Sequence, residues 1–412
     1  MEAAKQRTLL TDLPIELLFL IFRQCIDTKS WPNLRLICHA TDEIAIPVVF
    51  ESLKVIIWPS TSSDSLETLD NIFGNYGNHI RTLIISNVVF LCSNIEERNI
   101  SRKARRILGR GFSHCTQLRN LVCSDLHGMF SSRTSLSPPA PVSLTSLSIT
   151  PMKTGADLSY CLLALKDSLR SLEIRDWKLQ HGNQLPFHLP SFLPHLTDLI
   201  LTDSFPPSAH LEKLFSCITA PAPPQSATPI IPLRSLNIST TEIHNRFPTT
   251  LTDILSILSA RQFGSHLRTL RVTCHKVPGL DPTMATALVR ACPNLVEFAF
   301  HCNRVDKSLL SSLPCTLAVL ELVGTHSDSL YFHGPGFNIL SSEFLALWLR
   351  DNAPLALRSV SVQVFEGDVA RLVQILGIHF DEAMLTHVGS RINLQREGEH
   401  FKMVDSDARY VA

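Results

Sequence analysis

The amino-acid sequence predicts an α/β fold. A short unit of three helices over residues 8–50 precedes an α/β solenoid over residues 51–380 and a C-terminal cap or tail over residues 381–412. Three observations support this prediction. Helix-start signals crowd the first fifty residues, a six-residue apolar motif then recurs ten times, and helix-like segments separate the copies of that motif.

The first helix is predicted from Pro14 and the apolar run after it. Proline suits a first helical turn, because its missing N–H would have no partner there. Asp12 and Glu16 place negative charge at the positive end of the helix. The six residues 17–22 are all apolar, so this helix is apolar around most of its circumference. It therefore needs an apolar neighbour beyond its own domain.

Two further short helices are predicted before residue 50. Residues 30–32 (Ser-Trp-Pro) supply an N-cap and an early proline, and they open a helix with Leu34 and Ile37 on one face. Residues 41–43 (Thr-Asp-Glu) mark another start, and Pro47 stops or kinks that helix. A unit this small buries too little of its surface to be stable alone. We therefore expect an obligate partner.

These residues resemble the F-box, a three-helix motif that docks on the Skp-type adaptor of cullin-RING (SCF) ubiquitin ligases. The resemblance lies in Leu13-Pro14-x-Glu16-Leu17-Leu18-x-x-Ile21-Phe22 and Leu34-x-x-Ile37-Cys38. Residues 47–58 resemble the strand that leaves the F-box in many fungal members. The basic and aromatic residues that often come after the cysteine are replaced by residues 39–41. The resemblance implies contact with the adaptor, and through it with a cullin, by Leu13, Pro14, Leu17, Leu18, Ile21, Phe22, Leu34 and Ile37.

A motif of the form L-x-x-L-x-[apolar] recurs from residue 80 onward. The alternation at its end indicates a half-buried strand. The spacing between successive copies runs from 22 to 40 residues. The ten copies begin at Ile80, Leu118, Leu144, Leu169, Leu196, Leu233, Leu267, Leu295, Leu317 and Leu357.

Helix-like segments lie between the predicted strands. They include Thr249–Phe263, the segment that opens at Asp281-Pro282, and Ser341–Arg350. A repeated order of strand, loop and helix resembles leucine-rich repeats, which place a parallel sheet on the concave side and helices on the convex side. The uneven spacing resembles the degenerate repeats of fungal F-box proteins. The alternative is an ordinary α/β fold with leucine-rich strands.

Composition narrows the classes of function. Lys plus Arg and Asp plus Glu both number 37, which argues against a general nucleic-acid or membrane-surface role. No apolar run reaches the ~20 residues that span a bilayer, and the charged start is not a signal peptide. Eleven cysteines without a C-x-x-C pair indicate reduced thiols, and hence a cytoplasmic or nuclear location.

The sequence contains no catalytic motif. Phosphate-binding, nucleophile-elbow and H-E-x-x-H patterns are all missing, so we expect no enzyme activity, metal or cofactor. Two proline-rich stretches, residues 135–143 and 220–232, are predicted as extended insertions. Their alternative role is recognition in the polyproline II form.

The repeats offer a surface for a protein partner. Residues between the leucines of each motif point to the concave side, and their charges gather in two zones. The alternative is that they only solvate an exposed sheet. The candidate partner-binding residues are Glu173, Arg175 and Asp198 in one zone and Arg271, Glu297, His301 and Glu321 in the other.

The sequence supports three hypotheses of function. The leading one is a substrate receptor of an SCF-type ubiquitin ligase, which binds a target protein through the repeats. The second is a non-catalytic scaffold that is not assembled with a cullin. The third is an enzyme or small-molecule sensor whose N-terminal helices pack on the repeats.

Overall fold

The computed structural model places most of the repeat region. It divides the chain into two compact units, Met1–Leu169 and Arg170–Ala412. The described residues are 17, 45–58, 60–86, 95–123, 144–150, 162–177, 192–219, 231–241, 246–260, 263–274, 283–301, 308–323, 342–363, 372, 374–377, 391–398 and 400–403.

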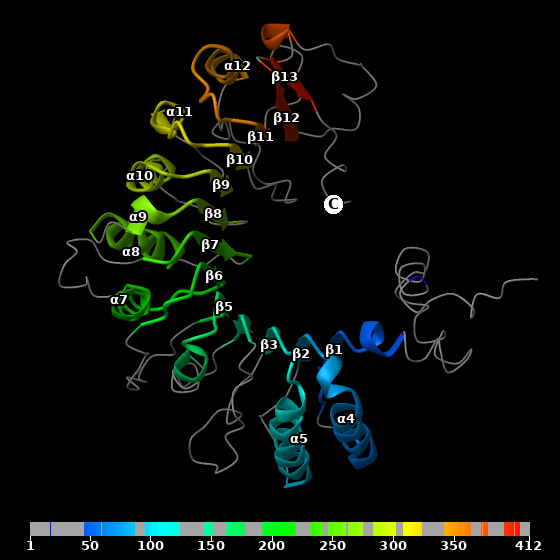
Figure 1. Cartoon of the computed structure of the whole chain (residues 1–412). Coiled ribbons are helices and arrows are strands. Elements are labelled where there is room, and N and C mark those ends of the chain that lie inside the picture. Colours follow the sequence, from blue (N-terminus) through cyan, green and yellow to red (C-terminus); the bar gives the residue numbers. More distant parts are fainter. Residues whose placement is uncertain are drawn as a thin grey trace, which may run out of the picture. The chain divides into compact units, whose positions relative to one another are not determined.

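The first unit contains four described strands that pair in chain order, all parallel. Two long helices lie side by side on one side of these strands (Figure 1). The strands are β1 (Ser52–Ile56), β2 (Thr82–Ser86), β3 (Asn120–Cys123) and β4 (Ser146–Ile149). The helices are α4 (Ser63–Tyr76), with the 3-10 turn η3 (Gly77–His79) after it, and α5 (Ile95–His114).

Local chemistry sets the bounds of α4. Ser62 is its N-cap, and the Ser62 hydroxyl accepts a hydrogen bond from the backbone N–H of Ser65 at 3.1 Å. Leu66 and Phe73 are buried on the inner face of the helix. At the other end Tyr76 stacks on Phe50, with ring centroids 4.1 Å apart. The helix is therefore fixed at both ends and along one face.

The second unit begins with seven parallel strands, also paired in chain order. Helices stack along the outer side of this curved row of strands (Figure 1). The strands are β5 (Ser171–Arg175), β6 (Asp198–Thr202), β7 (Ser235–Thr240), β8 (Thr269–Cys274), β9 (Glu297–His301), β10 (Val319–Val323) and β11 (Ser359–Gln363). The helices are α7 (Ser208–Cys217), α8 (Phe247–Ala260), α9 (Phe263–His266), α10 (Met284–Ala291), α11 (Ser308–Ser312) and α12 (Ser342–Asp351).

The core coincides with the repeated motif. The residue that begins each of the ten copies is fully buried, with 0% exposure. The next apolar position is also buried in all ten, from Leu83 to Val360. Neighbouring strands align these positions in register, so that Leu236 lies beside Leu270 and Leu270 beside Phe298. The ten predicted strands are β2 to β11.

The three helices expected from the sequence are present. The segment 249–263 contains most of α8 and the start of α9, and the other two segments contain α10 and all of α12 except its last residue. Gly264 allows the close approach of α9 to α10. A Cβ atom there would lie 1.8 Å from the carbonyl oxygen of Ala291, so no larger residue fits at this contact.

Strands β1 to β4 and β5 to β11 pair in parallel, as the repeats predict, and an antiparallel hairpin follows β11. Strand β12 (Arg391–Glu397) pairs antiparallel with β11, and β13 (His400–Met403) returns antiparallel to β12. From the sequence alone, this stretch is expected only as part of a C-terminal cap or tail. Gly398 makes the turn with a φ of +63°, which glycine adopts without steric cost. The hairpin closes the row of strands after β11.

Strand β1 extends the repeat array toward the N-terminus. Leu53 and Val55 pair with Leu83 and Ile85, so residues 50–55 match the motif with phenylalanine in the first position. The expected strand within residues 47–58 is thus present, and it belongs to the sheet. Of residues 1–44 the structure describes only Leu17, and the predicted helices of that segment lie outside the described residues. The proline-rich stretches do as well, apart from Ile231 and Pro232.

Candidate functional site

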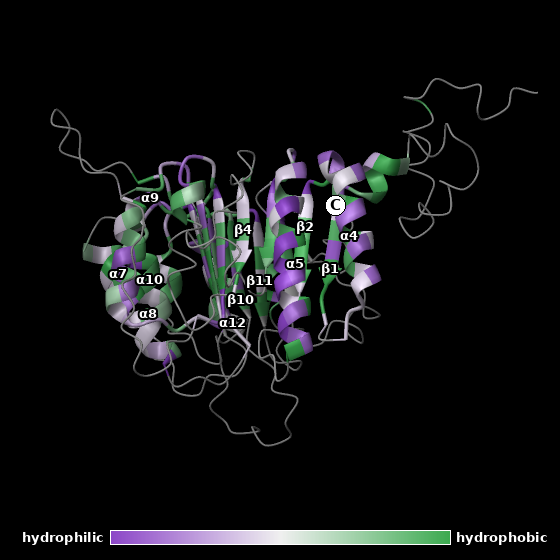
Figure 2. Ribbon diagram, turned by 90° about the horizontal axis from the view of Figure 1, so that it is seen from below, coloured by the Kyte–Doolittle hydropathy of each residue, from purple (hydrophilic) through white to green (hydrophobic). Residues whose placement is uncertain are grey.

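The candidate site is the exposed side of the second unit's sheet, here called the strand face. Side chains alternate along each strand, and those opposite the buried leucines form rows because the strands are in register. Figure 2 shows the alternation of hydrophilic and hydrophobic residues along the strands. The rows are Ser171, Asp198, Ser235, Thr269 and Glu297; Glu173, Ile200, Asn237, Arg271, Ala299 and Glu321; and Arg175, Thr202, Ser239, Thr273 and His301.

Glu173 and Arg175 form a two-pronged ion pair on β5. Nε of Arg175 donates to Oε1 of Glu173 at 2.7 Å, and Nη2 donates to Oε2 at 2.8 Å. The hydrogen bonds to Glu173 raise the pKa of Arg175, although burial opposes the shift. Thr202 on β6 also donates to Oε1 of Glu173, at 3.3 Å. Because Ser239 then donates to Thr202, one polar network crosses three strands.

Asp198 does not join this network. Its Oδ2 accepts a hydrogen bond from the Thr197 hydroxyl at 2.6 Å, and it pairs in register with Ser171 and Ser235. The first predicted zone is therefore one ion pair with a separate carboxylate near the start of β6.

The second predicted zone consists of two pairs. Arg271 on β8 forms an ion pair with Glu297 on β9. Nε2 of His301 lies 3.1 Å from Oε1 of Glu321 on β10. This second contact is proximity rather than an aligned hydrogen bond, since Nε2 is buried without an aligned partner in the described part of the chain. Ala299 stands between Arg271 and Glu321 in their row and separates the two pairs.

Asn237 is not one of the seven candidate partner-binding residues, and it occupies the middle of the same face. It lies in register between Ile200 and Arg271. Its Oδ1 atom is buried and has no hydrogen-bond partner among the described residues. A buried acceptor without a donor costs about 1–3 kcal/mol. A ligand that donates a hydrogen bond here would remove that cost.

Two aspartates fix the turns beside this face, and they too were missed. Asp176 and Asp203 come directly after β5 and β6 with φ of 54° and 48°. The asparagine or cysteine that usually turns the chain after the strand of a leucine-rich repeat is not regular in this sequence. Aspartate, like asparagine, adopts left-handed backbone more readily than most residues. An aspartate directly after the predicted strand was the sequence signal that could have identified these turns.

Arginines recur at one position of the repeat, directly after its first residue. Nη1 of Arg234 donates to the carbonyl of His266 at 3.2 Å, and Nη1 of Arg268 donates to that of Asn294 at 3.3 Å. Each accepting carbonyl belongs to the residue before the next copy of the motif. These two arginines therefore tie successive repeats together.

Among the described residues there is neither a candidate metal site nor a candidate membrane-spanning helix. They contain no group of three or more metal-ligating side chains, and no described helix is long and apolar enough to cross a bilayer. Burial raises the pKa of the Cys115 and Cys292 thiols to about 12. Thiols held neutral in this way are poor nucleophiles.

Comparison with known proteins gives limited similarity. No family model matches the chain. A curated relative, F-box/LRR-repeat protein 12 of Bos taurus, is 32% identical over 81 residues, which are 18% of this chain and 25% of that protein. The chain thus matches about a quarter of the length of this relative. An internalin structure from Listeria monocytogenes str. 4b F2365 aligns with 75% of this chain and 84% of its own, with a TM-score of 0.29 and 15% identity.

Proposed function

We propose that this chain is the substrate-recognition subunit of an SCF-type E3 ubiquitin ligase. The observation that carries the proposal is the strand face, a rigid and mostly polar surface built from seven parallel strands. Extended solenoid surfaces of this kind suit the recognition of another protein. The similarity to an F-box/LRR-repeat protein supports the same class.

The two ends of the chain have different roles in this proposal. Residues 8–50 bind a Skp-type adaptor, and through it a cullin, by the eight F-box-like residues from Leu13 to Ile37. Leu17 is 47% exposed, as expected of an apolar side chain that a binding partner would bury. The strand face binds a target protein and raises its effective concentration near the ubiquitin-carrying enzyme. The chain itself makes and breaks no covalent bond and needs no cofactor.

Target recognition is assigned to Glu173, Arg175, Asp198, Arg271, Glu297, His301 and Glu321. Most of these charges are already paired within the face, so their pairs present a fixed pattern of partial charge rather than loose side chains. Such a pattern gives specificity and orientation more than affinity. The buried Oδ1 atom of Asn237 adds one position where a hydrogen-bond donor of the target would stabilise the complex.

Co-expression with a fungal Skp-type adaptor, followed by size-exclusion chromatography, tests the proposal. We expect a stable one-to-one complex that Leu13→Ala with Pro14→Ala abolishes. Leu163→Ala with Leu355→Ala is the matched control, because these leucines are 55% and 91% exposed in the repeats. If the wild-type chain does not bind the adaptor, or if the complex still forms with Leu13→Ala and Pro14→Ala, the assignment of residues 8–50 as the adaptor site is wrong.

Addition of the cullin to the same co-expression separates a ligase subunit from a scaffold. A ligase subunit co-purifies with both adaptor and cullin. An adaptor complex that excludes the cullin supports the alternative, a non-catalytic repeat scaffold. A cytoplasmic or nuclear location is part of the proposal, because the ligase components act there.

A further inference from the structure

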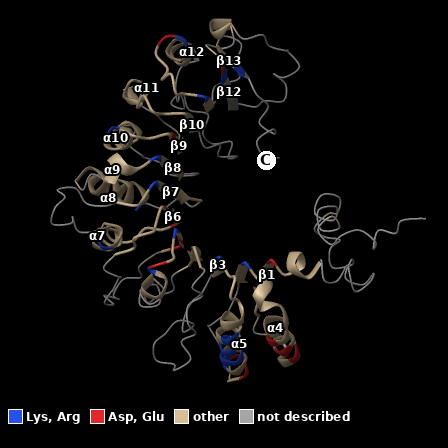
Figure 3. Ribbon diagram, in the orientation of Figure 1, with Lys and Arg blue, Asp and Glu red and all other residues tan. Residues whose placement is uncertain are grey.

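Helix α5 carries a concentration of positive charge that the proposed function does not use. Its sequence holds six lysines and arginines against two glutamates, in a chain whose formal net charge is zero. Figure 3 shows this blue helix beside the acidic end of α4. The six basic residues do not have the same surroundings.

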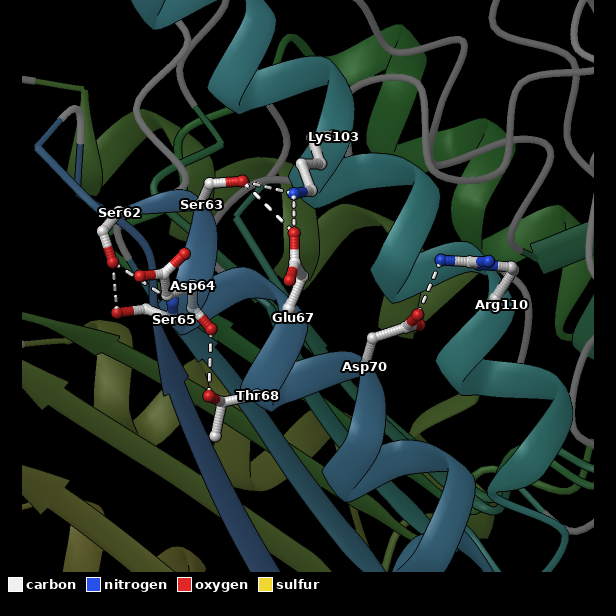
Figure 4. A network of polar contacts seen from close by, with 9 residues as sticks. All are labelled: Ser62, Ser63, Asp64, Ser65, Glu67, Thr68, Asp70, Lys103 and Arg110. Atoms are coloured by element: carbon white, nitrogen blue, oxygen red, sulfur yellow. Dashed lines mark hydrogen bonds and ion pairs between the residues drawn. The ribbon is translucent and has the colours of Figure 1, made fainter.

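Two of the six are paired with α4. Nζ of Lys103 donates to Oε1 of Glu67 at 2.9 Å, and Nη2 of Arg110 donates to Oδ2 of Asp70 at 2.8 Å (Figure 4). Lys103 also lowers the pKa of Glu67, through the hydrogen bond and through its charge. A further residue, Arg105, is half-buried and has contacts of its own. These three belong to the packing of the first unit.

The other three form a stripe on the exposed side of α5. Arg98, Arg102 and Arg106 are four residues apart and exposed, so their Cα atoms succeed one another at about 6 Å along the helix axis. None of them forms an ion pair or side-chain hydrogen bond with another residue that the structure describes. We call these three residues the arginine stripe.

The arginine stripe opposes the stability of the helix that bears it. Like charges four residues apart destabilise a helix by about 0.2–0.5 kcal/mol per pair, and the stripe contains two such pairs. Two acidic side chains of α4, Glu67 and Asp70, are already engaged by Lys103 and Arg110. Negative charge supplied by a partner beside the arginine stripe would relieve this repulsion.

We propose that the arginine stripe binds an acidic segment of a partner protein. Guanidinium groups bind carboxylates with paired hydrogen bonds. Alternate side chains of an extended segment repeat at about 6.6–6.8 Å on one side, close to the spacing of the stripe. Carboxylates at every second residue can therefore meet successive arginines. Nucleic acid is the less favoured ligand, because three contacts give weak phosphate binding and the chain is neutral overall.

Fluorescence anisotropy with the full chain tests this inference independently of the proposed function. The probe is a labelled twelve-residue peptide of alternating Glu and Ser. We expect binding at 50 mM salt that weakens as the Debye length falls from about 10 Å at 0.1 M to about 3 Å at 1 M. Replacement of all three stripe residues (R98Q/R102Q/R106Q) is expected to weaken binding about tenfold. R98K/R102K/R106K keeps the charge but loses the paired guanidinium hydrogen bonds, so we expect its affinity to lie between those of the wild type and the glutamine variant.

The matched control is R119Q/R170Q/R358Q, which removes the same charge from exposed arginines of three separate repeats. It is expected to change the affinity less than about threefold. Equal losses in the two triple variants, or no binding by the wild type, overturn the proposal. A twelve-nucleotide single strand that binds more tightly than the peptide, through the same arginines, would overturn it in favour of nucleic acid. Circular dichroism of each variant verifies that the overall helix content is unchanged.

Discussion

At the scale of single residues, Asp203 shows how one side chain joins two repeats. Its Oδ1 accepts hydrogen bonds from the Thr241 N–H at 2.8 Å and the Thr240 hydroxyl at 3.0 Å, and its Oδ2 accepts one from the Thr241 hydroxyl at 2.9 Å. Its backbone is left-handed, with φ of 48°. The carboxylate thus holds the end of β7 while the backbone turns the chain after β6.

Replacement of Asp203 by alanine is expected to lower the free energy of unfolding by about 2–3 kcal/mol. Three hydrogen bonds to a charged acceptor are lost, and alanine tolerates left-handed backbone poorly. Asp203→Asn keeps one acceptor and much of that tolerance, so its loss should be smaller. Urea unfolding monitored by circular dichroism measures both. Equal losses for the two variants would show that the hydrogen bonds are not the cause.

A buried thiol makes stability depend on pH at the alkaline end. Burial raises the pKa of Cys292 from 9.0 to about 12. Between these values the unfolded chain binds fewer protons than the folded one, so stability falls as the pH rises. The contribution of the neutral thiol is complete below pH 9 and is lost toward pH 12. The slope is at most about 1.4 kcal/mol per pH unit.

Cys292→Ala should therefore be less damaging at high pH than at neutral pH. The substitution leaves a small cavity at every pH, and it also removes the alkaline loss of the wild type. Urea unfolding of both proteins at pH 7.5, 9 and 10.5 gives the difference in free energy at each pH. A difference that stays constant across this range would show that the thiol does not ionise differently on unfolding.

At the scale of elements, the contact between α4 and α5 depends on close approach more than on charge. The ion pairs Lys103–Glu67 and Arg110–Asp70 are largely exposed, and exposed pairs contribute about 0–1 kcal/mol. Gly111 of α5, in contrast, lies against the ring of Phe73 of α4. A Cβ atom at Gly111 would stand 2.5 Å from Cδ2 of Phe73. This glycine sets how closely the two helices pack.

Two glycine substitutions in α5 should have opposite signs. Gly111→Ala is expected to destabilise the chain by about 1–3 kcal/mol, because the added methyl group overlaps Phe73. Gly109→Ala meets no atom within 4 Å and should stabilise the helix by up to about 1 kcal/mol. Thermal unfolding compares them. Rescue of Gly111→Ala by Phe73→Leu would identify the ring as the obstacle, and equal effects at both glycines would contradict the packing argument.

At the scale of the whole molecule, each strand is stabilised mainly by the strands of the adjacent repeats. Within each unit, the described strands pair with those next to them in the chain. At its C-terminal end, β12 covers β11, and the buried Ser361 hydroxyl donates to Oδ1 of Asn393 at 2.7 Å. The hairpin of β12 and β13 thereby supplies hydrogen-bond partners to the backbone of β11, which would otherwise be an open edge able to pair with another chain.

Truncation after residue 390 should loosen the second unit from its C-terminal end. Without β12, the backbone of β11 loses its partner on one side and Ser361 loses its acceptor. Hydrogen exchange is expected to quicken most in β11, less in β10 and little in β5 and β6, because coupling passes between neighbours. Uniform loss of protection across the unit would indicate a single cooperative block.

The sequence predicts the repeated core well, because burial of one apolar position every repeat is a strong periodic signal. All ten predicted strands are present. Strand β1 was expected within residues 47–58, but it was not recognised as a copy of the motif because Phe50 takes the place of leucine. The hairpin was not predicted, because the apolar alternation that begins with Ile392 and Leu394 is interrupted by Arg396 and Glu397. Two charged pairs of the strand face, Arg271–Glu297 and His301–Glu321, depend on register between strands, which no single copy of the motif specifies.

The in-register ladder also bears on how such a chain changes in length. The spacing between copies varies from 22 to 40 residues, yet the buried positions stay aligned because the variation falls in the connections. Duplication or deletion of one strand with its connection would leave the remaining interfaces chemically unchanged, and the hairpin would still end the row. Recognition surfaces of different length can thus arise within one architecture without a new core.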